Sequence, residues 1–459
     1  METYAVHDPA TLHEVGRAPQ MTDRDVDAAV ATARAAQADW SADREARRAA
    51  LLACATRLRA NAPQIGELLS REQGKPVREA VQEALVGAGM LEYYAELAWD
   101  EEELLPPRAD RTVRVQNRPV GVVATITPWN FPLSLLLVKL APALVAGCTV
   151  VSKPSESTPL STMAMVETMC AELPPGVLQY VTGTGKDVNV ALSEHPDIAK
   201  LSFTGSTGVG VALMTQAAPS LKRLTMELGG NDPAILLEDA DPGTTARGIV
   251  SSAFRNAGQV CMAVKRVYAP RGMADDLAEA LAEAANRLVV GRGLDPATTM
   301  GPLHNQRQLE HVGGLVRAAE TSGARVVAGG GRGCDLPGYF LAPTVVAGAD
   351  DSMGLVSDEQ FGAALPVVAY DDLESTVAGL NRQPYGLGAS IWSPDLDRAT
   401  AVAETIEAGT VWVNQHTQVE PDAAFGGWRH SGFGRERGPW GLAPYLEQRT
   451  LNVRTHTTP

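Results

Sequence analysis

Residues 121–153 read GVVATITPWNFPLSLLLVKLAPALVAGCTVVSK and carry the clearest fold signal in the chain. Two short apolar runs, at 120–127 and 149–152, have the length and the β-branched content of buried strands. The longer apolar stretch between them fits a buried helix over about 133–146. Its length would also permit a membrane span. The lysine, proline and glycine that interrupt it favour instead a buried helix that leads into a strand.

The same alternation continues beyond this segment. Strand-like runs at 177–181 and 201–203 alternate with helical segments at about 158–172 and 187–194. Strands separated by helices form parallel sheets with helices on both faces. This part of the chain therefore predicts a doubly wound α/β domain.

The flanking sequence adds helices before this domain and a second α/β region after it. The first hundred residues predict a helix that begins near Thr22, a second over 45–71 with a break near Pro63, and a third over 79–99. After Gly230 the alternation restarts, which predicts a second α/β domain. Its strand candidates are 267–269, 325–328, 366–370, 389–392 and 410–413, and its helix candidates are 244–257, 274–288, 305–322, 372–381 and 396–407.

Composition excludes several classes of protein. The chain has 39 Lys and Arg against 54 Asp and Glu residues, a net charge of -15 at pH 7. Such a surface repels phosphate backbones, so we expect no nucleic-acid partner. The five cysteines are widely spaced and contain no CxxC pair, which argues against a disulfide framework and against a structural metal site. With no secretory signal near Met1, the sequence predicts a cytoplasmic protein without membrane or metal partners.

Four short segments carry residue types that suit chemistry. Cys261 lies in the segment 258–263, where a free cysteine could equally be a core residue. Asn130 follows a predicted buried strand, at the edge where ligands bind in open parallel sheets, and two prolines stiffen its loop. Glu227 precedes a Gly-Gly turn. The glycine-rich turn at 203–208 would open a helix whose first amides suit phosphate oxygens.

These segments together resemble the NAD(P)-dependent aldehyde dehydrogenase superfamily, of the hydrolytic, non-acylating type. The similarity runs through the whole chain and includes Lys153-Pro154-Ser155-Glu156, Glu359-Gln360-Phe361-Gly362, Phe425-Gly426-Gly427 and Gly434-Arg435-Glu436. The resemblance implies three parts and a homodimer or homotetramer. The parts are a doubly wound NAD-binding domain at 1–98 and 120–229, an α/β catalytic domain at 230–441, and a small oligomerisation sheet from 99–119 and 442–459.

The resemblance also assigns the reacting groups. Cys261 would attack the aldehyde carbon to give a thiohemiacetal, and the Asn130 side-chain amide and the Cys261 backbone N–H would stabilise its oxygen. Hydride transfer to the nicotinamide would leave a thioester, and Glu227 would activate the water that hydrolyses it to a carboxylic acid. Glu447 matches a second carboxylate near the water path, or is a surface residue. Lys139 matches a lysine behind the site, or is a solvated helix residue.

The same resemblance implies an NAD site. Glu156 at the adenosine ribose would repel a 2′-phosphate, so NAD is expected as the cofactor and NADP is the alternative. Ala363 replaces a proline that usually follows Gly362, and the lost φ constraint predicts a mobile nicotinamide loop. The cofactor-binding residues would be Thr127, Trp129, Lys153, Ser155, Glu156, Gly205, Ser206, Glu359 and Phe361.

The aldehyde tunnel would be lined mostly by apolar side chains. Its residues would be Phe131, Ser134, Leu135, Val138, Val260, Met262 and Phe425. Relatives that take small aldehydes often carry bulky aromatic residues on the helix after Asn130, and their absence here predicts a roomier tunnel. His416, Glu420 and Asp422 are expected on a rim loop, where negative charge would disfavour anionic aldehydes. A medium-sized neutral or cationic aldehyde is therefore the expected substrate.

Two other functions stay open at this point. A CoA-acylating aldehyde dehydrogenase would use a thiol in place of water, but such relatives typically lack the carboxylate found here as Glu227. A non-catalytic binding protein on the same fold is the other alternative. The presence of Cys261, Glu227 and Asn130 counts against it.

Overall fold

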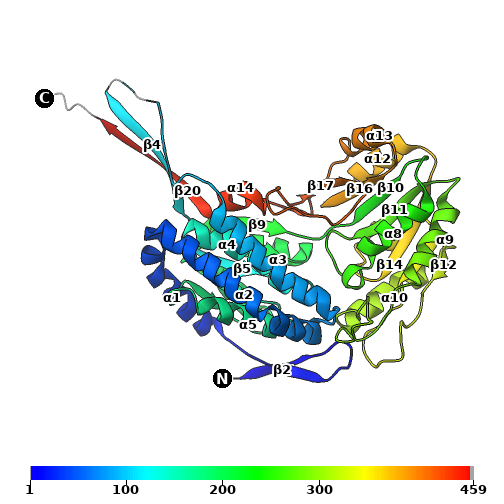
Figure 1. The fold of residues 1–459 in the computed structure, drawn as a ribbon, viewed down its shortest axis with the longest axis horizontal. Helices are drawn as coiled ribbons and strands as arrows, with labels where there is room; N and C mark the ends of the chain where they lie inside the picture. The colour runs from blue at the N-terminus through cyan, green and yellow to red at the C-terminus, as the bar shows by residue number, and fades with distance from the viewer. Residues whose placement is uncertain (1, 107, 109, 455–459) are drawn as a thin grey trace.

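The computed structural model describes residues 2–106, 108 and 110–454, and most of them form two α/β lobes (Figure 1). The first lobe is built on a six-stranded sheet with the order β19-β9-β8-β5-β6-β7, in which all pairs except β19–β9 are parallel. The chain runs outward from β5 to β7 on one side and then from β8 to β9 on the other. This confirms the doubly wound α/β fold and puts the topological switch point between β5 and β8. The strands are β5 (Val122–Ile126), β6 (Thr149–Lys153), β7 (Leu178–Tyr180), β8 (Ile198–Thr204), β9 (Arg223–Glu227) and β19 (Gly432–Phe433).

Helices cover this sheet on both faces. The predicted apolar helix is confirmed as α4, and every residue of α4 is buried except Ser134 and Leu135. The predicted break near Pro63 is wrong, because α2 continues through that residue. Pro63 removes one backbone hydrogen bond, but its neighbours Ala62 and Ile65 are buried, and this packing outweighs the lost bond. The helices are α1 (Asp23–Ala42), α2 (Arg44–Gln73), α3 (Val77–Glu96), α4 (Pro132–Ala146), α5 (Pro159–Cys170), α6 (Asp187–Glu194) and α7 (Thr207–Ala217).

The second lobe contains a seven-stranded sheet with the order β12-β13-β14-β11-β10-β16-β17. All its pairs are parallel except β12–β13, which confirms the second α/β region. The sequence analysis missed β10 and β13. The strands are β10 (Asp232–Leu236), β11 (Val264–Pro270), β12 (Arg325–Ala328), β13 (Thr344–Ala349), β14 (Ala364–Tyr370), β16 (Gly388–Trp392) and β17 (Thr410–Val413). The helices are α8 (Pro242–Ala253), α9 (Ala274–Ala285), α10 (Gln306–Thr321), α11 (Gly354–Ser357), α12 (Leu373–Asn381) and α13 (Leu396–Ala403).

Smaller elements connect and extend the two lobes. The hairpin of β1 (Thr3–His7) and β2 (Glu14–Pro19) lies below them in Figure 1. A three-stranded antiparallel sheet of β3 (Glu102–Leu104), β4 (Arg111–Pro119) and β20 (Leu446–Arg454) extends away from the first lobe (Figure 1). The remaining short elements are β15 (Tyr385–Gly386), β18 (Trp428–Arg429) and α14 (Gly438–Leu442).

The division into domains stays a prediction. The sequence analysis assigned 230–441 to one catalytic domain, but β19 from this range pairs with β9 in the sheet of the first lobe. The chain therefore returns to the first lobe before β20 begins. Residues 455–459 of the predicted oligomerisation segment lie outside the described residues.

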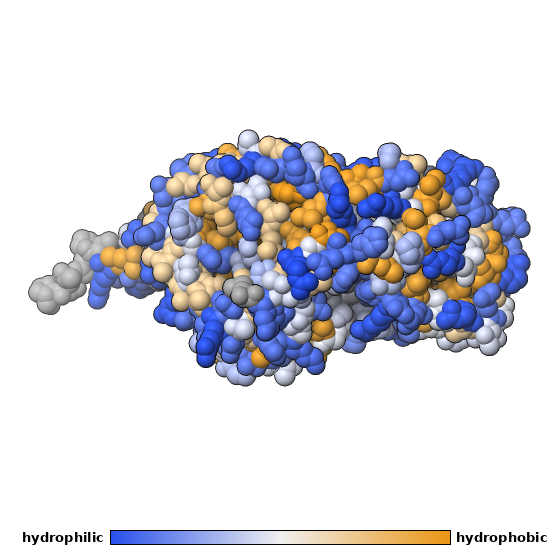
Figure 2. Space-filling model, turned by 90° about the horizontal axis from the view of Figure 1, so that it is seen from below, coloured by the Kyte–Doolittle hydropathy of each residue, from blue (hydrophilic) through white to orange (hydrophobic). Residues whose placement is uncertain are grey.

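On the face seen in Figure 2, apolar patches alternate with hydrophilic side chains. Within the described part of the chain, no helix combines the length and the hydropathy that a bilayer crossing needs.

Candidate active site

Asn130 lies in the loop after β5, at the topological switch point. The side chain is buried, with 3% exposed, and its Nδ2 donates to the Gln259 carbonyl oxygen at 3.0 Å. The Asn130 carbonyl oxygen in turn accepts from Lys75 Nζ at 2.7 Å and from Asn256 Nδ2 at 3.1 Å. Nδ2 carries two N–H groups, so this arrangement leaves the second one for a ligand.

Cys261 follows a loop with an unusual backbone. Asn256, Ala257 and Gly258 all have positive φ values, of 49°, 56° and 76°. Left-handed conformations cost non-glycine residues about 1–3 kcal/mol each, and such strain is typical of functional sites. The Asn130–Gln259 hydrogen bond joins this loop to the loop after β5, so the fold brings Cys261 and Asn130 to one place.

The surroundings of Cys261 disfavour a resting thiolate. The pKa of the thiol is raised to about 12, chiefly by burial and then by the carboxylates of Glu359, Asp232 and Glu227 in that order. Lys265 acts in the opposite direction. The thiol therefore needs a base before it can act as a nucleophile.

Glu227 is a suitable base, because it ends β9 in a buried position. Burial raises its pKa well above the ordinary value, and the nearby Glu436 raises it further. Neither carboxylate oxygen has a hydrogen-bond partner within the described residues. A Cβ atom on Gly426 would lie 2.8 Å from Glu227 Oε1, so glycine at that position leaves the carboxylate room.

The second carboxylate of the site is Glu436. It forms a buried ion pair with Lys139, which is fully buried, so the alternative of a solvated helix lysine is wrong. Glu447 lies on β20 and pairs with Arg223, and both side chains are 47% exposed. The surface alternative for Glu447 is therefore correct. The quoted motif Gly434-Arg435-Glu436 contained the signal that could have identified Glu436.

A cleft of about 470 Å³ contains the next set of predicted residues. It is lined by Asn130, Cys261, Trp129, Glu359, Phe361, Gly205 and Ser206, among others. The sequence analysis missed four further residues of its wall, Asn305, Arg307, Gln308 and His311, at the start of α10. Gln308 Nε2 donates to the carbonyl oxygens of Gln360 and Phe361, at 2.8 and 2.9 Å. Exposed polar residues at a helix start were the available signal for them.

The cleft fits a dinucleotide. Ser206 is the N-cap of α7, so the first amides of this helix face the cleft without a side-chain cap. The buried hydroxyls of Thr127 and Thr204 have no partner in the described structure, although both lie beside the switch point. Unused donors and a helix N-terminus suit ribose hydroxyls and phosphate oxygens.

Glu359 and Phe361 lie at the end of the cleft near Cys261. Glu359 Oε1 accepts from the Gly230 N–H at 3.2 Å, and burial raises the pKa of Glu359 to about 7. The Phe361 ring packs edge-on against Trp129, with centroids 5.7 Å apart. Gln360 Nε2 donates to two backbone carbonyl groups, which ties the loop down despite the missing proline. Mobility of this loop stays a prediction.

The residues predicted at the adenosine end lie after β6. Lys153 is buried with 5% exposed, and burial lowers its pKa while Glu156 acts in the opposite direction. Glu156 is exposed and its Oε2 accepts from the Gly185 N–H at 2.9 Å. Ser155 Oγ accepts from the Ser157 N–H at 3.3 Å. A carboxylate and an ammonium group therefore lie together beyond the carboxyl end of β6.

The predicted tunnel residues surround the same loops. Ser134 and Leu135 are the two residues of α4 that are not buried, and Phe131 and Met262 are partly buried. The other three, Val138, Val260 and Phe425, are buried. Arg255, which the sequence analysis did not consider, lies beside them with its guanidinium carbon 5.5 Å from the Phe131 ring centroid.

The expected rim position of His416 is wrong. Its side chain is fully buried against Trp412 and lies 3.5 Å from Asp232 Oδ2. Glu420 and Asp422 are exposed, as expected for a surface loop. His416 lies three residues after β17, and its ring packs against Trp412 of that strand with centroids 4.5 Å apart.

Comparisons with known proteins all match this chain to aldehyde dehydrogenases. The model of the Aldehyde dehydrogenase family matches residues 1–451. A succinate-semialdehyde dehydrogenase of Arabidopsis thaliana is 39% identical over 450 residues, which cover 97% of this chain and 85% of the relative. A 3-sulfolactaldehyde dehydrogenase of Pseudomonas putida is 38% identical over 97% of this chain and 92% of its own length. Among solved structures, betaine aldehyde dehydrogenase of Staphylococcus aureus in complex with NAD+ superposes with a TM-score of 0.96 and 31% identity, over 100% of this chain and 93% of that one.

Proposed function

This chain belongs to the aldehyde dehydrogenase family, and on that premise we propose how its own residues perform the reaction. It is an oxidoreductase that oxidises an aldehyde to a carboxylic acid with NAD or NADP. The observation that supports the residue assignment best is the Asn130–Gln259 hydrogen bond, since it joins the predicted oxyanion donor to the loop of the predicted nucleophile.

Cys261 is the nucleophile in this proposal, and Glu227 removes its proton. The thiol pKa of about 12 makes a base necessary, and the nearby Glu227 carboxylate has a raised pKa and no hydrogen-bond partner among the described residues. Sγ then bonds to the aldehyde carbon, and the resulting oxygen anion accepts from the free N–H of Asn130 Nδ2 and from the Cys261 amide. Preorganised donors of this kind contribute about 10²–10³ to the rate each.

NAD, when bound in the cleft, would supply the hydride acceptor for the oxidation of the carbon attached to Sγ. Thr127, Trp129, Gly205, Ser206, Glu359 and Phe361 would hold the cofactor near the reacting carbon, and Lys153, Ser155 and Glu156 would hold its adenosine end. A negative charge at Glu156 disfavours a 2′-phosphate, so NAD is the preferred cofactor in this proposal.

Glu227 acts a second time, on the thioester, after it has released the proton of Cys261 to solvent. It takes a proton from water, whose oxygen attacks the acyl carbon, and Cys261 leaves as the thiolate. Glu436 next to it raises the Glu227 pKa, which makes this carboxylate a stronger base. Lys139 compensates the charge of Glu436 through their buried ion pair.

We further propose an aldehyde with a negatively charged end as the substrate. Arg255 has an exposed side chain beside Phe131, and Phe131 directly follows Asn130. The positive charge therefore lies at the aldehyde side of the site. Succinate semialdehyde and 3-sulfolactaldehyde, the substrates named for two relatives, both carry an anionic group. This proposal departs from the expectation of a neutral or cationic aldehyde, which rested on the negative charges of the loop with Glu420 and Asp422 and on the lack of an arginine cluster in the sequence, and which did not consider Arg255.

The assembly and the location of the protein are also proposals. The sheet of β3, β4 and β20 extends from the lobe with open edges, which favour pairing with another copy of the chain. We therefore propose a homodimer or homotetramer, which light scattering of the purified protein would test. The free state of all five cysteines supports a reducing, cytoplasmic location.

One experiment tests the catalytic assignment and the substrate together. Purified protein is assayed for NADH or NADPH formation with succinate semialdehyde, phenylacetaldehyde and betaine aldehyde, which are anionic, neutral and cationic. We expect the highest kcat/KM for the anion with NAD, and no dependence on added CoA. Cys261→Ala should abolish turnover, and activity retained in this variant would refute the nucleophile. Arg255→Gln should raise KM for succinate semialdehyde at least about tenfold and leave phenylacetaldehyde unchanged.

A further inference from the structure

Lys75 is fully buried at the turn between α2 and α3, outside the cofactor cleft. Its Nζ donates to Glu83 Oε2 at 2.5 Å and to the Asn130 carbonyl oxygen at 2.7 Å. The same ammonium group lies 3.7 Å from the centroid of the Phe131 ring. An ammonium group has three N–H donors and no acceptor, so these three contacts occupy all of its N–H groups. Two of them go to adjacent residues of the loop after β5.

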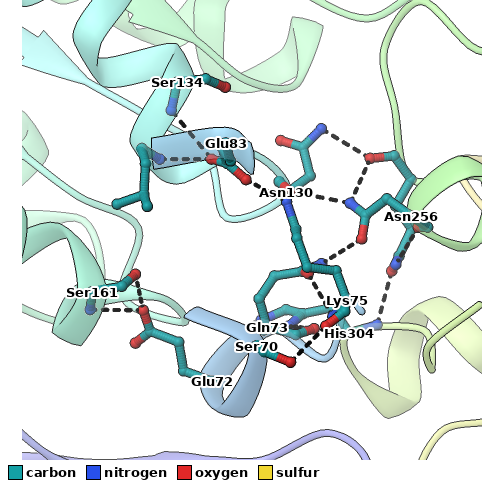
Figure 3. A network of polar contacts seen from close by, with 12 residues as sticks. Ser70, Glu72, Gln73, Lys75, Glu83, Asn130, Ser134, Ser161, Asn256 and His304 are labelled. Atoms are coloured by element: carbon teal, nitrogen blue, oxygen red, sulfur yellow. Dashed lines mark hydrogen bonds and ion pairs between the residues drawn. The ribbon is translucent and has the colours of Figure 1, made fainter. Parts of the chain in front are cut away.

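Glu83 extends this contact to the start of α4. Its second carboxylate oxygen accepts from the backbone N–H groups of Leu133 and Ser134, at 2.8 and 3.2 Å. The carboxylate therefore caps α4 while the other oxygen holds Lys75, as Figure 3 shows. Both sides of the Asn130 loop are thus attached to one buried ion pair from the α2–α3 region.

Gln73, two residues before Lys75, reaches the loop of Cys261. Its Nε2 donates to Asn256 Oδ1 at 3.1 Å, and its Oε1 accepts from the Lys75 N–H at 3.0 Å (Figure 3). Asn256 Nδ2 donates to the Asn130 and Gln259 carbonyl oxygens, at 3.1 and 3.4 Å. The turn between α2 and α3 therefore binds the two loops that meet at the reacting carbon.

The turn is itself held by the second lobe. The Val77 N–H donates to the Gly293 carbonyl oxygen at 2.8 Å. A Cβ on Gly301 would lie 2.1 Å from the Gly74 carbonyl oxygen, so the two backbones touch. Ser70 Oγ donates to the Lys75 carbonyl oxygen at 2.7 Å and closes the turn. A turn that is fixed on both sides can hold a loop in place.

We propose that Lys75 is a positioning residue, which acts through Asn130 and sets the direction of its free amide N–H toward the substrate oxygen. The inference rests on the proposed function, because it assumes that Asn130 is the oxyanion donor. Lys75 itself does not reach the reacting atoms. It fixes the Asn130 carbonyl, while the hydrogen bond to Gln259 fixes the Asn130 side chain. Loss of Lys75 should therefore impair the stabilisation of an oxyanion and leave other chemistry at Cys261 intact.

Two reagents separate these effects without any cofactor. p-Nitrophenyl acetate transfers its acetyl group to Sγ of Cys261 through a tetrahedral oxyanion, and p-nitrophenolate leaves. Iodoacetamide transfers a carbamidomethyl group to the same sulfur by direct displacement of iodide, without an oxyanion. Both reactions need the thiolate. The ratio of the two rates at Cys261, measured by nitrophenolate release and by mass spectrometry of the Cys261 peptide, therefore reports oxyanion stabilisation.

The variant for the test is Lys75→Met with Glu83→Gln. The double substitution avoids a buried, unpaired carboxylate and keeps an amide oxygen to cap α4. We expect acetylation of Cys261 to slow at least about tenfold, and alkylation to stay within about twofold of the wild type. In an Asn130→Ala background, the same pair of substitutions should change the acetylation rate by less than about twofold, because the residue through which Lys75 acts is gone.

Glu72→Gln is the matched control. Glu72 lies at the same turn and accepts from the backbone N–H groups of Leu160 and Ser161 at the start of α5, so it contacts neither catalytic loop (Figure 3). Its two rates should match the wild type. If acetylation and alkylation fall together in the double variant, or if neither falls, the positioning role is refuted. If Asn130→Ala leaves acetylation unchanged, the proposed oxyanion role of Asn130 fails instead.

Discussion

The carboxylates of Glu227 and Glu359 both raise the pKa of the Cys261 thiol, but they differ in their hydrogen-bond partners and charged neighbours. Burial is the largest cause of a raised pKa for each carboxyl group. Glu359 has a fixed donor, the Gly230 N–H, and the charge of Lys265 limits its pKa to about 7. Glu227 has no such donor among the residues that the structure describes, and its strongest charged neighbour is another carboxylate, Glu436.

This difference in hydrogen-bond partners and neighbouring charges determines which role each carboxylate suits. A carboxylate without fixed donors can turn and exchange protons with a thiol or a water. A carboxylate that is held by an amide and balanced by a lysine keeps its place, and with a pKa of about 7 it gains its charge as the pH rises through neutrality, which suits a ligand-binding role that strengthens with pH. Burial alone therefore does not distinguish a base from a ligand-binding group, because the hydrogen-bond partners and the nearby charges decide between them.

Of the substitutions that test this difference, Glu227→Gln should have the largest effect on turnover. The amide can remove a proton neither from the Cys261 thiol nor from water, so formation and hydrolysis of the thioester should both slow, and steady-state turnover should fall about 10³-fold. Rapid-mixing measurements should show that NADH formation in the first turnover is itself slower than in the wild type. Glu359→Gln serves as the control and should keep the wild-type first-turnover rate at saturating NAD. A first turnover at the wild-type rate in Glu227→Gln would mean that Glu227 does not deprotonate Cys261.

Glu436→Gln should move the Glu227 pKa downward. The substitution removes the like charge that raises this pKa, so the rate of thioester hydrolysis should reach its plateau at lower pH than in the wild type. Lys139 loses its buried partner, and the unfolding free energy should fall by about 3 kcal/mol. Single-turnover rates measured from about pH 5 to about pH 9 would show the shift of the Glu227 pKa. A pH profile that does not change would contradict the electrostatic effect of Glu436 on Glu227.

Glu359→Gln should mainly weaken the cofactor. A charge-assisted hydrogen bond to a ribose hydroxyl is replaced by a neutral one, so the Kd for NAD should rise about tenfold. In the wild type, Glu359 is ionised above pH about 7, so NAD affinity should increase as the pH rises through that value. The variant should lack this dependence. Calorimetric titration at pH values roughly one unit below and above 7 compares the two proteins.

Glu156→Ala should have the smallest effect, far from both carboxylates. It removes the charge that repels a 2′-phosphate, so the ratio of the Kd values for NADP and NAD should fall about fivefold. The Kd for NAD itself should change little, since Glu156 also bonds the Gly185 N–H. Titration with both dinucleotides measures the ratio. A constant ratio would assign the cofactor preference to other residues.

Much of the fold could be predicted because its signals are local. The helix α4 is apolar except for Ser134 and Lys139, and a buried helix of this kind can be recognised from its sequence. By contrast, β9 begins with Arg223, and β10 contains Asp232 and Pro233 in five residues. These strands lack a local apolar pattern. They form because neighbouring strands supply their hydrogen bonds and bury them.

The candidate site divides in the same way. Cys261, Asn130 and Glu227 were assigned through the resemblance to the family, which rests on short motifs that taken singly left their roles open. The sequence analysis named Glu447 as a second carboxylate or a surface residue, and it did not consider Glu436 for this role, which lies in the same C-terminal region. The choice depends on the return of β19 to β9 and on the ion pair with Lys139, which involve residues hundreds of positions apart.

The order of residues was enough to predict the α/β class from local patterns and, through the resemblance to the family, to propose three catalytic side chains and the cofactor-binding turns. The folded chain was needed for the partners of those groups: Glu436 beside Glu227, Lys75 behind Asn130, and His416 buried against Asp232. Electrostatic and hydrogen-bond effects depend on distance in space, and distance along the chain does not report it.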